Sequence, residues 1–521
     1  MAIKKILLLL YLLLVITPSI CFATDYYVRT DGNNANDGLG PGTDHAWATI
    51  TYAESQLSNG AHTVHIAAGT YDEDVYINGI SGTDENNRIV FVGAGSVYID
   101  RITVGTYYNS GEANYITLSN LILGGDKNAI YNAIVTISWL SDYITVTGCT
   151  LDGLNMNGVQ GIVMGGNHNL MTGCTLQNFL NSNMVDMGQQ GCLEALGCND
   201  SNTATLNVLK DGVKCDLFHL HGTNMTISYN TCTNFTAPYP EGNHPDFVQW
   251  YPNYDSGDPE GSCTGVKSIE HAIIEGNFVS NVWGQPFYGN NQCYTAGYTD
   301  IIVDDIVFRN NVFDTINFQG GNYGDLGQSN VKFYNNTFYK VGHTRWYYSD
   351  AESHGCTGWC SSSPDPYCSC SYSTGAFDLG SNITGIEVYN NIFLECGDMS
   401  GLYYTPSSIG WYSLPVSAVD DYNYAARGVE GAYAAKNATF QTANPGTGVY
   451  SGNPLFVTEG SNWHLQAGSP LIGAATPIGS FTTDKDGVIR GASWDIGAYE
   501  YTEGGSTPTA TGLTIQGVQI Q

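Results

Sequence analysis

Two short polar segments carry the residue types that acid–base chemistry needs. His219-Leu220-His221 places two imidazoles on alternate residues, so both face the same side of a strand if Leu220 points into the core. The segment 244–249 adds His244 and Asp246 nearby in the sequence. A histidine and an aspartate with separated pKa values supply the proton donor and acceptor that cleavage of a glycan requires. We therefore predict His221, His244 and Asp246 as catalytic residues, with His219 binding substrate beside them.

Gln249 joins this set if Phe247 sits at a small irregularity of the strand. Further polar and aromatic residues recur at intervals that place them on the same face of a stacked sheet, and aromatic rings offer surfaces on which sugars stack. We predict Arg345 as a fourth catalytic residue. The predicted substrate-binding residues are His219, Gln249, Trp250, Lys267, Gln285, Tyr288, Gln319, His343 and Trp346. The alternative is that these polar side chains are merely solvated and that the rings pack within turns.

Metal binding is an alternative role for the same residues. His219, His221, His244 and Asp246 are transition-metal ligands by type, although none of the usual helical spacings is present. Acidic turns such as 300–305 and 484–486 offer oxygen ligands, but neither completes a calcium-loop motif. The sequence alone does not decide whether a metal is bound.

Short apolar runs that end in Asn or Cys recur along the chain. The marked residues are Asn120, Cys149, Cys174, Asn230, Asn277, Asn311, Asn336 and Asn391. The shortest spacing is 25 residues, from Cys149 to Cys174 and from Asn311 to Asn336, which is the length of one coil of a parallel β-helix. The pattern predicts an internal column in which each Asn bonds the next coil and Cys149 and Cys174 fill the same place. The predicted fold class is all-β, a right-handed parallel β-helix.

Both ends of the chain resemble the caps of secreted bacterial β-helix proteins of the pectate-lyase-like superfamily. At the N-terminal end the matching residues are Tyr26-Tyr27-Val28, Asp31-Gly32-Asn33, Trp47-Ala48-Thr49-Ile50 and Gly69-Thr70-Tyr71, with Ala46 where such proteins often place Pro. Helical spacing of Ile50, Ala53 and Leu57 predicts a helix there. At the C-terminal end the matching residues are Asn453–Phe456, His464–Pro470, Asp484–Gly487, Arg490 and Asp495–Glu500.

This resemblance implies ligand binding in a groove along one stacked sheet, and calcium as a candidate cofactor. The run Asp246-Phe-Val-Gln249 also resembles the Asp-Gly-apolar-Asp strand of polygalacturonases, but Gln249 replaces the second acid. A two-carboxylate hydrolytic mechanism therefore does not transfer directly. The expected organisation is a signal peptide over 1–23, a cap and first coils over 24–110, the β-helix over 111–420, a closing segment over 421–503 and a linker or tail over 504–521.

Compartment and partners follow from charge and from the first residues. Lys4 and Lys5 precede an apolar run, and small residues at 21 and 23 predict signal-peptide cleavage after Ala23, hence a secreted or cell-surface protein. A net charge of −31 excludes nucleic acid and anionic membranes as partners, and no second run is long enough to insert into a bilayer. Export favours two disulfides over zinc among Cys356, Cys360, Cys368 and Cys370. A monomer is expected.

The sequence therefore predicts a secreted, carbohydrate-active protein that cleaves a polysaccharide as a lyase or a glycoside hydrolase. The alternative is a non-catalytic protein that binds glycans or builds a cell surface. The cluster of His and Asp residues between 219 and 249 favours an enzyme. The missing second carboxylate and the few basic residues favour the non-catalytic alternative.

Overall fold

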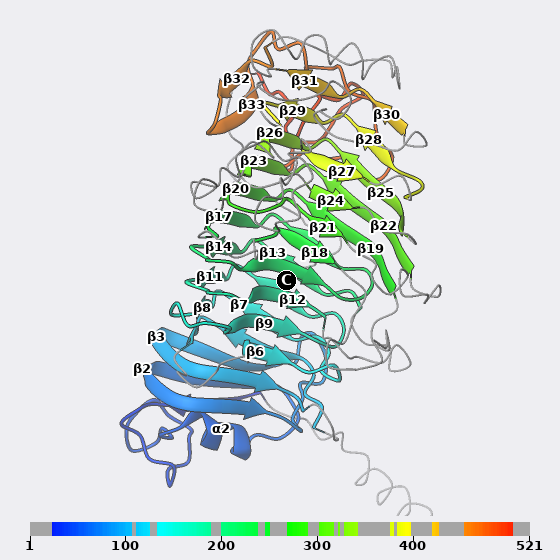
Figure 1. Cartoon of the computed structure of the whole chain (residues 1–521). Coiled ribbons are helices and arrows are strands. Elements are labelled where there is room, and N and C mark those ends of the chain that lie inside the picture. The colour runs from blue at the N-terminus through cyan, green and yellow to red at the C-terminus, as the bar shows by residue number, and fades with distance from the viewer. Residues whose placement is uncertain are drawn as a thin grey trace, which may run out of the picture.

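The chain is an elongated solenoid of stacked β-coils (Figure 1). The structure is a computed structural model that describes residues 23–106, 111–124, 133–188, 200–237, 245–250, 268–289, 302–316, 321–323, 328–341, 376–379, 383–396, 419–426 and 453–503. In this part of the chain, 31 strands join in one continuous sheet of parallel pairs, and one short helix and one two-stranded antiparallel sheet accompany it. Parallel strands joined by crossovers wind right-handed, so the predicted right-handed parallel β-helix is confirmed.

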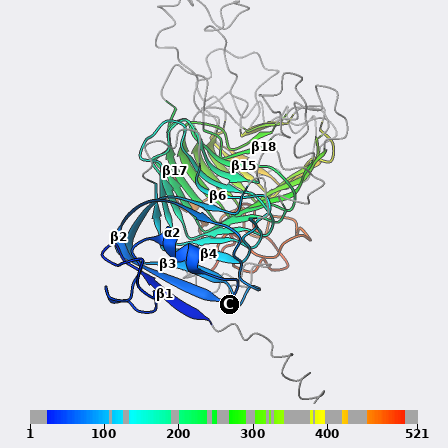
Figure 2. The ribbon, with the colours of Figure 1, turned by 90° about the horizontal axis from the view of Figure 1, so that it is seen from below.

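The N-terminal end is closed by strand β1 (Thr24–Val28), helix α2 (Ile50–Gln56) and the long strands β2 (His62–Ile77) and β3 (Ile89–Val104). Thr49 caps the helix by accepting a hydrogen bond from the Tyr52 backbone nitrogen. Ile50 and Ala53 are buried, and Figure 2 shows α2 and β1 lying across this end of the solenoid. The predicted helix is confirmed. Gly69-Thr70-Tyr71, which resembles the cap of β-helix proteins, lies inside β2, where the register with β3 is irregular.

Each later coil contributes up to three strands, which stack into three ladders. The first ladder holds β4 (Ile116–Ser119), β7 (Thr145–Thr147), β10 (Leu170–Thr172), β13 (Thr203–Thr205), β16 (Thr226–Ser228), β19 (Ser268–Glu275), β22 (Ile302–Arg309), β25 (Gln328–Tyr334), β28 (Glu387–Tyr389) and β30 (Val419–Asp421). The second holds β5 (Ile122–Leu123), β8 (Thr150–Asp152), β11 (Thr175–Gln177), β14 (Val208–Lys210), β17 (Thr231–Phe235), β20 (Phe278–Val282), β23 (Val312–Ile316), β26 (Thr337–Val341), β29 (Ile392–Leu394) and β31 (Tyr424–Ala426). The third holds β6 (Ala133–Ile137), β9 (Gln160–Met164), β12 (Asn183–Met187), β15 (Asp216–Leu220), β18 (Val248–Trp250), β21 (Tyr288–Gly289), β24 (Gly321–Tyr323) and β27 (Phe377–Leu379).

An internal column of asparagines joins the coils. Asn311 is fully buried, and its Nδ2 donates to Ile274 O at 2.8 Å and to Asn336 Oδ1 at 2.9 Å. Its Oδ1 accepts from both the backbone nitrogen and Nδ2 of Asn277, each at 2.9 Å. The inner members of the column repeat this pattern, which satisfies the buried backbone groups where the strand direction changes. The predicted stack of Asn277, Asn311, Asn336 and Asn391 is confirmed, and it extends to Asn207, Asn230 and Asn423. The prediction for Asn120 is wrong, because Asn120 is exposed and the next residue, buried Leu121, occupies that place in the column.

Buried cysteines continue this column toward the N-terminus. The backbone nitrogen of Cys174 donates to Asn207 Oδ1 at 2.9 Å, and Cys149 lies one coil before it. The described cysteines are all buried and free, and they are Cys149, Cys174, Cys215, Cys232 and Cys396. The predicted disulfides among Cys356, Cys360, Cys368 and Cys370 lie outside the described residues.

The C-terminal segment packs against the last coils. It contains β32 (Phe456–Thr458) and β33 (Asn462–Leu465), shown in orange in Figure 1. Buried Arg490 forms an ion pair with Glu500, and its Nη2 donates to Asn310 Oδ1 at 2.9 Å. Asn335 Nδ2 donates to the backbone oxygen of Asp495 at 2.9 Å. These buried polar contacts attach the closing segment to the outer side of the coils.

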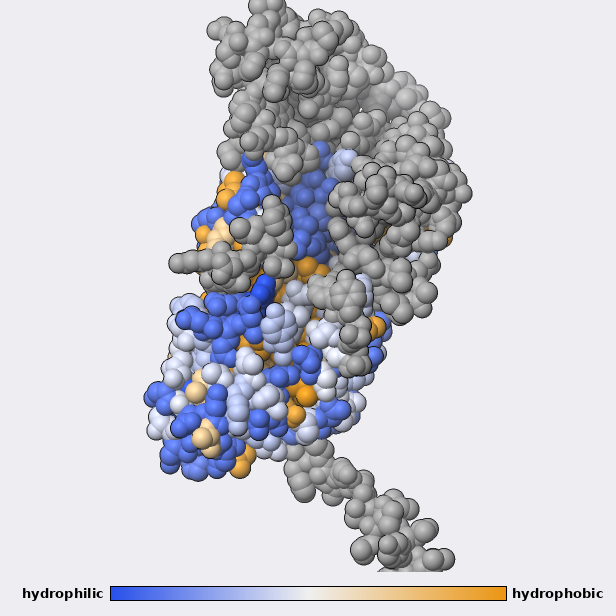
Figure 3. All heavy atoms as spheres, turned by 60° about the horizontal axis from the view of Figure 1, so that its bottom comes forward, coloured by the Kyte–Doolittle hydropathy of each residue, from blue (hydrophilic) through white to orange (hydrophobic). Residues whose placement is uncertain are grey.

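The surface of the solenoid is largely polar on the face seen in Figure 3. Hydrophilic residues dominate there, and hydrophobic residues form small spots. In the described residues no helix is long and apolar enough to cross a membrane. The expected signal peptide up to residue 22 and the tail from residue 504 lie outside the described residues.

Candidate functional site

A four-residue pattern recurs on four successive coils of the third ladder. It reads polar, apolar, apolar, polar in the segments 183–186, 216–219, 246–249 and 285–288. The two middle residues of each segment are buried in the solenoid. The first and last residues therefore both point to the outer face, because two consecutive inward residues break the usual alternation. Phe247 and Val248 both point inward, so the strand is irregular at Phe247 and Gln249 faces outward with Asp246, as the sequence predicted.

Strand pairing brings the last residues of these segments into one outer row. Asp186 on β12 is paired with His219 on β15, His219 with Gln249 on β18, and Gln249 with Tyr288 on β21. Paired positions in neighbouring strands lie about 4.8 Å apart. The row thus aligns four different polar side chains along the solenoid axis.

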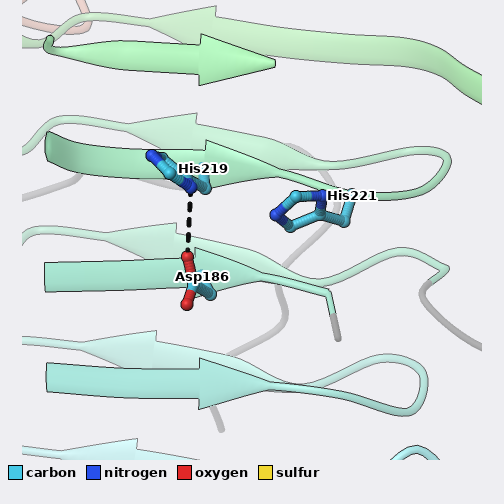
Figure 4. Close-up of side chains that lie close together, drawn as sticks. All are labelled: Asp186, His219 and His221. Carbon is cyan, nitrogen blue, oxygen red and sulfur yellow. Dashed lines mark ion pairs between the residues drawn. The ribbon is translucent and has the colours of Figure 1, made fainter. Parts of the chain in front are cut away.

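Two carboxylates hold the imidazole of His219. Nδ1 of His219 lies 3.4 Å from Asp186 Oδ1, and Nε2 lies 3.1 Å from Asp216 Oδ2 (Figure 4 shows the pair with Asp186). The amide nitrogen of Asn183 is 3.1 Å from Nδ1 of His219 and donates to Asp186 Oδ1 at 3.1 Å. Because the amide nitrogen is a donor, the neutral tautomer of His219 carries its proton on Nε2, toward Asp216.

Burial and charge shift the pKa values of these groups in different directions. Burial disfavours the His219 imidazolium, but the hydrogen bond to Asp216 and the charges of Asp186, Asp216 and Asp246 outweigh it and raise the pKa of His219. His221 is buried beside His219, and burial followed by that neighbouring charge lowers the pKa of His221 to about 3. Burial is also the main reason why the pKa of Asp186 is raised. The surroundings therefore shift the pKa values of the two histidines in opposite directions.

Asp246 belongs to the same centre from the next coil. Its side chain is 2 % exposed, its backbone nitrogen donates to Asp216 Oδ1 at 2.9 Å, and its charge acts on His219. Asp246 also forms a parallel bridge with Gln285 of the following coil. Asp246 thus lies on the same side of the solenoid as His219, as predicted.

Comparison with solved structures gives the same architecture. The crystal structure of pectate lyase Pel9A matches with a TM-score of 0.50 and 16 % identity, over 93 % of this chain and 98 % of that one. XylC in complex with xylose matches with a TM-score of 0.45 and 11 % identity over 92 % and 98 %. A rhamnogalacturonan lyase matches with a TM-score of 0.40 and 13 % identity over 84 % and 91 %. No family model and no curated protein matches the sequence.

The chain shares the parallel β-helix fold of pectate lyase Pel9A. At this level of identity the likeness establishes the architecture, whereas the chemistry has to be argued from the side chains of this chain.

The β-helix brings six of the predicted site residues onto adjacent coils. They are His219, His221, Asp246, Gln249, Gln285 and Tyr288, on or next to strands β15, β18 and β21. The predicted residues His244, Lys267, Gln319, His343, Arg345 and Trp346 lie outside the described residues.

Trp250 does not face a substrate, and its predicted binding role is wrong. It is paired with inward-facing Leu220, is fully buried, and stacks on Phe287 with ring centroids 5.9 Å apart. Its Nε1 donates to Gln328 Oε1 at 3.4 Å. Since Gln249 faces outward, the alternation of the strand sends the next side chain into the core.

Asp186 and Asp216 are part of the centre but were not predicted from the sequence. The pairing of Phe218 with Val248 places Asp216, and not Phe218, level with Asp246. The recurring pattern of polar, apolar, apolar, polar residues would have revealed both aspartates, because it places Asp216 level with Asp246 and adds the coil of Asp186.

The described residues do not fit the calcium ion that the resemblance implied. Asp305 pairs with His271 and Lys332, and Asp484 Oδ1 accepts hydrogen bonds from the backbone nitrogens of Asp486 and Val488. At the outer face of the third ladder, the converging ligand atoms come from two imidazoles and one carboxylate, whereas calcium takes six to eight oxygen ligands. We derive no step through calcium.

Proposed function

We propose that this protein is an extracellular enzyme that cleaves a polysaccharide bound along the outer face of the third ladder. The observation that carries the proposal is the burial of Asp186, His219 and Asp246 together on the outer face of a sheet, where their side chains contribute nothing to the apolar core. Burying ionisable groups costs free energy, and groups with perturbed pKa values concentrate at functional sites. The fold shared with a solved pectate lyase supports a polysaccharide as the substrate.

In this proposal Asp246 transfers the proton, and His219, which Asp186 and Asp216 hold in place, lies beside it. Gln249 and Tyr288 continue the outer row on the following coils, where they would bind hydroxyl groups of the polysaccharide. His221, in the neutral state, completes the wall of the site.

A panel of polysaccharides tests the proposal. The purified protein is incubated with acidic and neutral glycans, and two products are followed, the ultraviolet absorbance of an unsaturated uronide and the release of reducing ends. Elimination gives both signals and hydrolysis gives the second alone. Binding of a glycan without either product would replace the proposal by the non-catalytic alternative, and neither binding nor product across the panel would contradict both.

A further inference from the structure

One group of side chains on the third ladder has the arrangement of a metal site. Asp186, His219 and His221 each offer one ligand atom, and these atoms all lie within 4.8 Å of one another. All three residues are buried, and Figure 4 shows Asp186 and His219 facing each other across neighbouring strands, with His221 just beyond the end of β15. Within the described ranges no other set of three or more His, Cys, Asp or Glu side chains converges in this way.

Strand geometry holds the three ligands on one side. Asp186 and His219 are direct partners in neighbouring parallel strands, and His221 follows His219 by two residues, beyond inward-facing Leu220. A tetrahedral ion with bonds of about 2.1 Å separates its ligand atoms by about 3.4 Å. The Asp186 Oδ1 to His219 Nδ1 distance of 3.4 Å equals that separation. The ladder therefore sets one edge of a tetrahedral site without further movement.

The neighbours of His219 orient it as a ligand. Asp216 Oδ2 lies 3.1 Å from Nε2 of His219 and holds that nitrogen as the proton donor, so the lone pair of Nδ1 is on the side of Asp186. There it accepts a hydrogen bond from the Asn183 amide, which a bound ion would replace. A metal-bound histidine usually donates its second ring nitrogen to a carboxylate in this manner. Asn183 in turn donates to Asp186 Oδ1 and fixes the carboxylate. The outer partners that a metal ligand needs are thus already present.

We propose that Asp186, His219 and His221 bind a divalent transition-metal ion of the zinc class, in place of the calcium that the fold family implied. Two imidazole nitrogens and one carboxylate oxygen suit zinc and its neighbours, and three protein ligands leave the fourth position open for water or substrate. The carboxylate of Asp216 lies 3.1 Å from His219 and the charge of Asp246 acts on His219, so both favour an added positive charge. Asp246 is not a ligand, so metal binding leaves the proposed proton-transfer group in place.

This inference concerns the centre of the proposed function but is tested without any substrate. The full chain is dialysed against a chelator, and zinc chloride, cobalt chloride or calcium chloride is titrated in by calorimetry. We expect one zinc or cobalt ion per chain, visible absorption bands of four-coordinate cobalt, and no comparable binding of calcium. His221→Ala and Asp186→Asn should each abolish the cobalt bands, while Asp216→Asn should keep them and weaken binding about 10- to 100-fold.

His271→Ala is the matched control, because His271 also pairs with an aspartate, Asp305, but on the exposed surface of the first ladder. It should leave metal binding unchanged. Circular dichroism of every variant shows that the coils remain folded, and a variant that fails to fold is replaced by the second ligand variant. No zinc or cobalt binding, or binding that survives both His221→Ala and Asp186→Asn, would overturn the inference. Metal binding by a protein that cleaves no glycan would contradict the proposed function alone.

Discussion

Replacing Asn311 by leucine removes four hydrogen bonds from the middle of the internal asparagine column. The backbone nitrogen of Asn277 loses its acceptor, while Asn277 Nδ2, Asn336 Oδ1 and the backbone oxygen of Ile274 each lose one partner. A buried donor left unsatisfied costs about 1–3 kcal/mol, and each of the other lost bonds costs about 1 kcal/mol. Leucine is of similar size and regains part of this by its apolar contacts. We expect the free energy of unfolding to fall by about 3–6 kcal/mol.

The assay combines denaturant unfolding, followed by circular dichroism, with hydrogen exchange of the peptide that contains Asn277. Cys174→Ala is the control, because Cys174 occupies the same column without an amide, and its backbone nitrogen keeps its bond to Asn207. This control should cost about 1 kcal/mol. An Asn311→Leu variant no less stable than the control, or one whose Asn277 amide exchanges as slowly as in the wild type, would refute the account of the column.

Three other results are expected. Trp250→Ala should lower the free energy of unfolding by about 3–5 kcal/mol in thermal or denaturant melts, because it empties a core position. Trp250→Phe should retain glycan binding in a direct binding assay. Loss of binding without loss of stability would show that Trp250 contacts the glycan. Burial raises the pKa of Glu500 from 4.5 to about 7, so the folded state holds this proton more tightly and stability should fall as the pH rises from about 4.5 to about 7. Glu500→Gln should flatten that slope in melting curves recorded across this range, and an unchanged slope would assign it to other groups.

The β-helix could be predicted from the sequence because the residues that mark each coil repeat. Asn277, Asn311, Asn336 and Asn391 recur at a common place in each coil, and a repeated residue in a solenoid can be aligned without knowing what lies between. The N-terminal helix at Ile50 and Ala53 was equally visible from its spacing.

The candidate site was readable only in part. The spacings between the recurring segments are 33, 30 and 39 residues (183 to 216, 216 to 246 and 246 to 285), so a fixed period does not align them. Two consecutive inward residues, such as Leu217 and Phe218, break the two-residue alternation from which the sequence predicts which side chains face outward. Asp216 was therefore missed, and Trp250 was placed on the wrong face, since residue type alone does not tell which side of a strand a tryptophan occupies.

The turnover of Asp246→Asn on a polysaccharide that the wild type cleaves tests the central claim most directly. The substitution keeps the shape of the side chain and removes its charge, and loss of a general acid or base slows catalysis at least about 100-fold. Asp74→Asn, at an ion pair with Arg101 in the N-terminal cap, is the matched control. The account predicts a loss of at least about 100-fold for Asp246→Asn with an unchanged melting temperature, and wild-type turnover for the control. Equal turnover of the two variants would contradict the assignment of the active centre to the outer face of the third ladder.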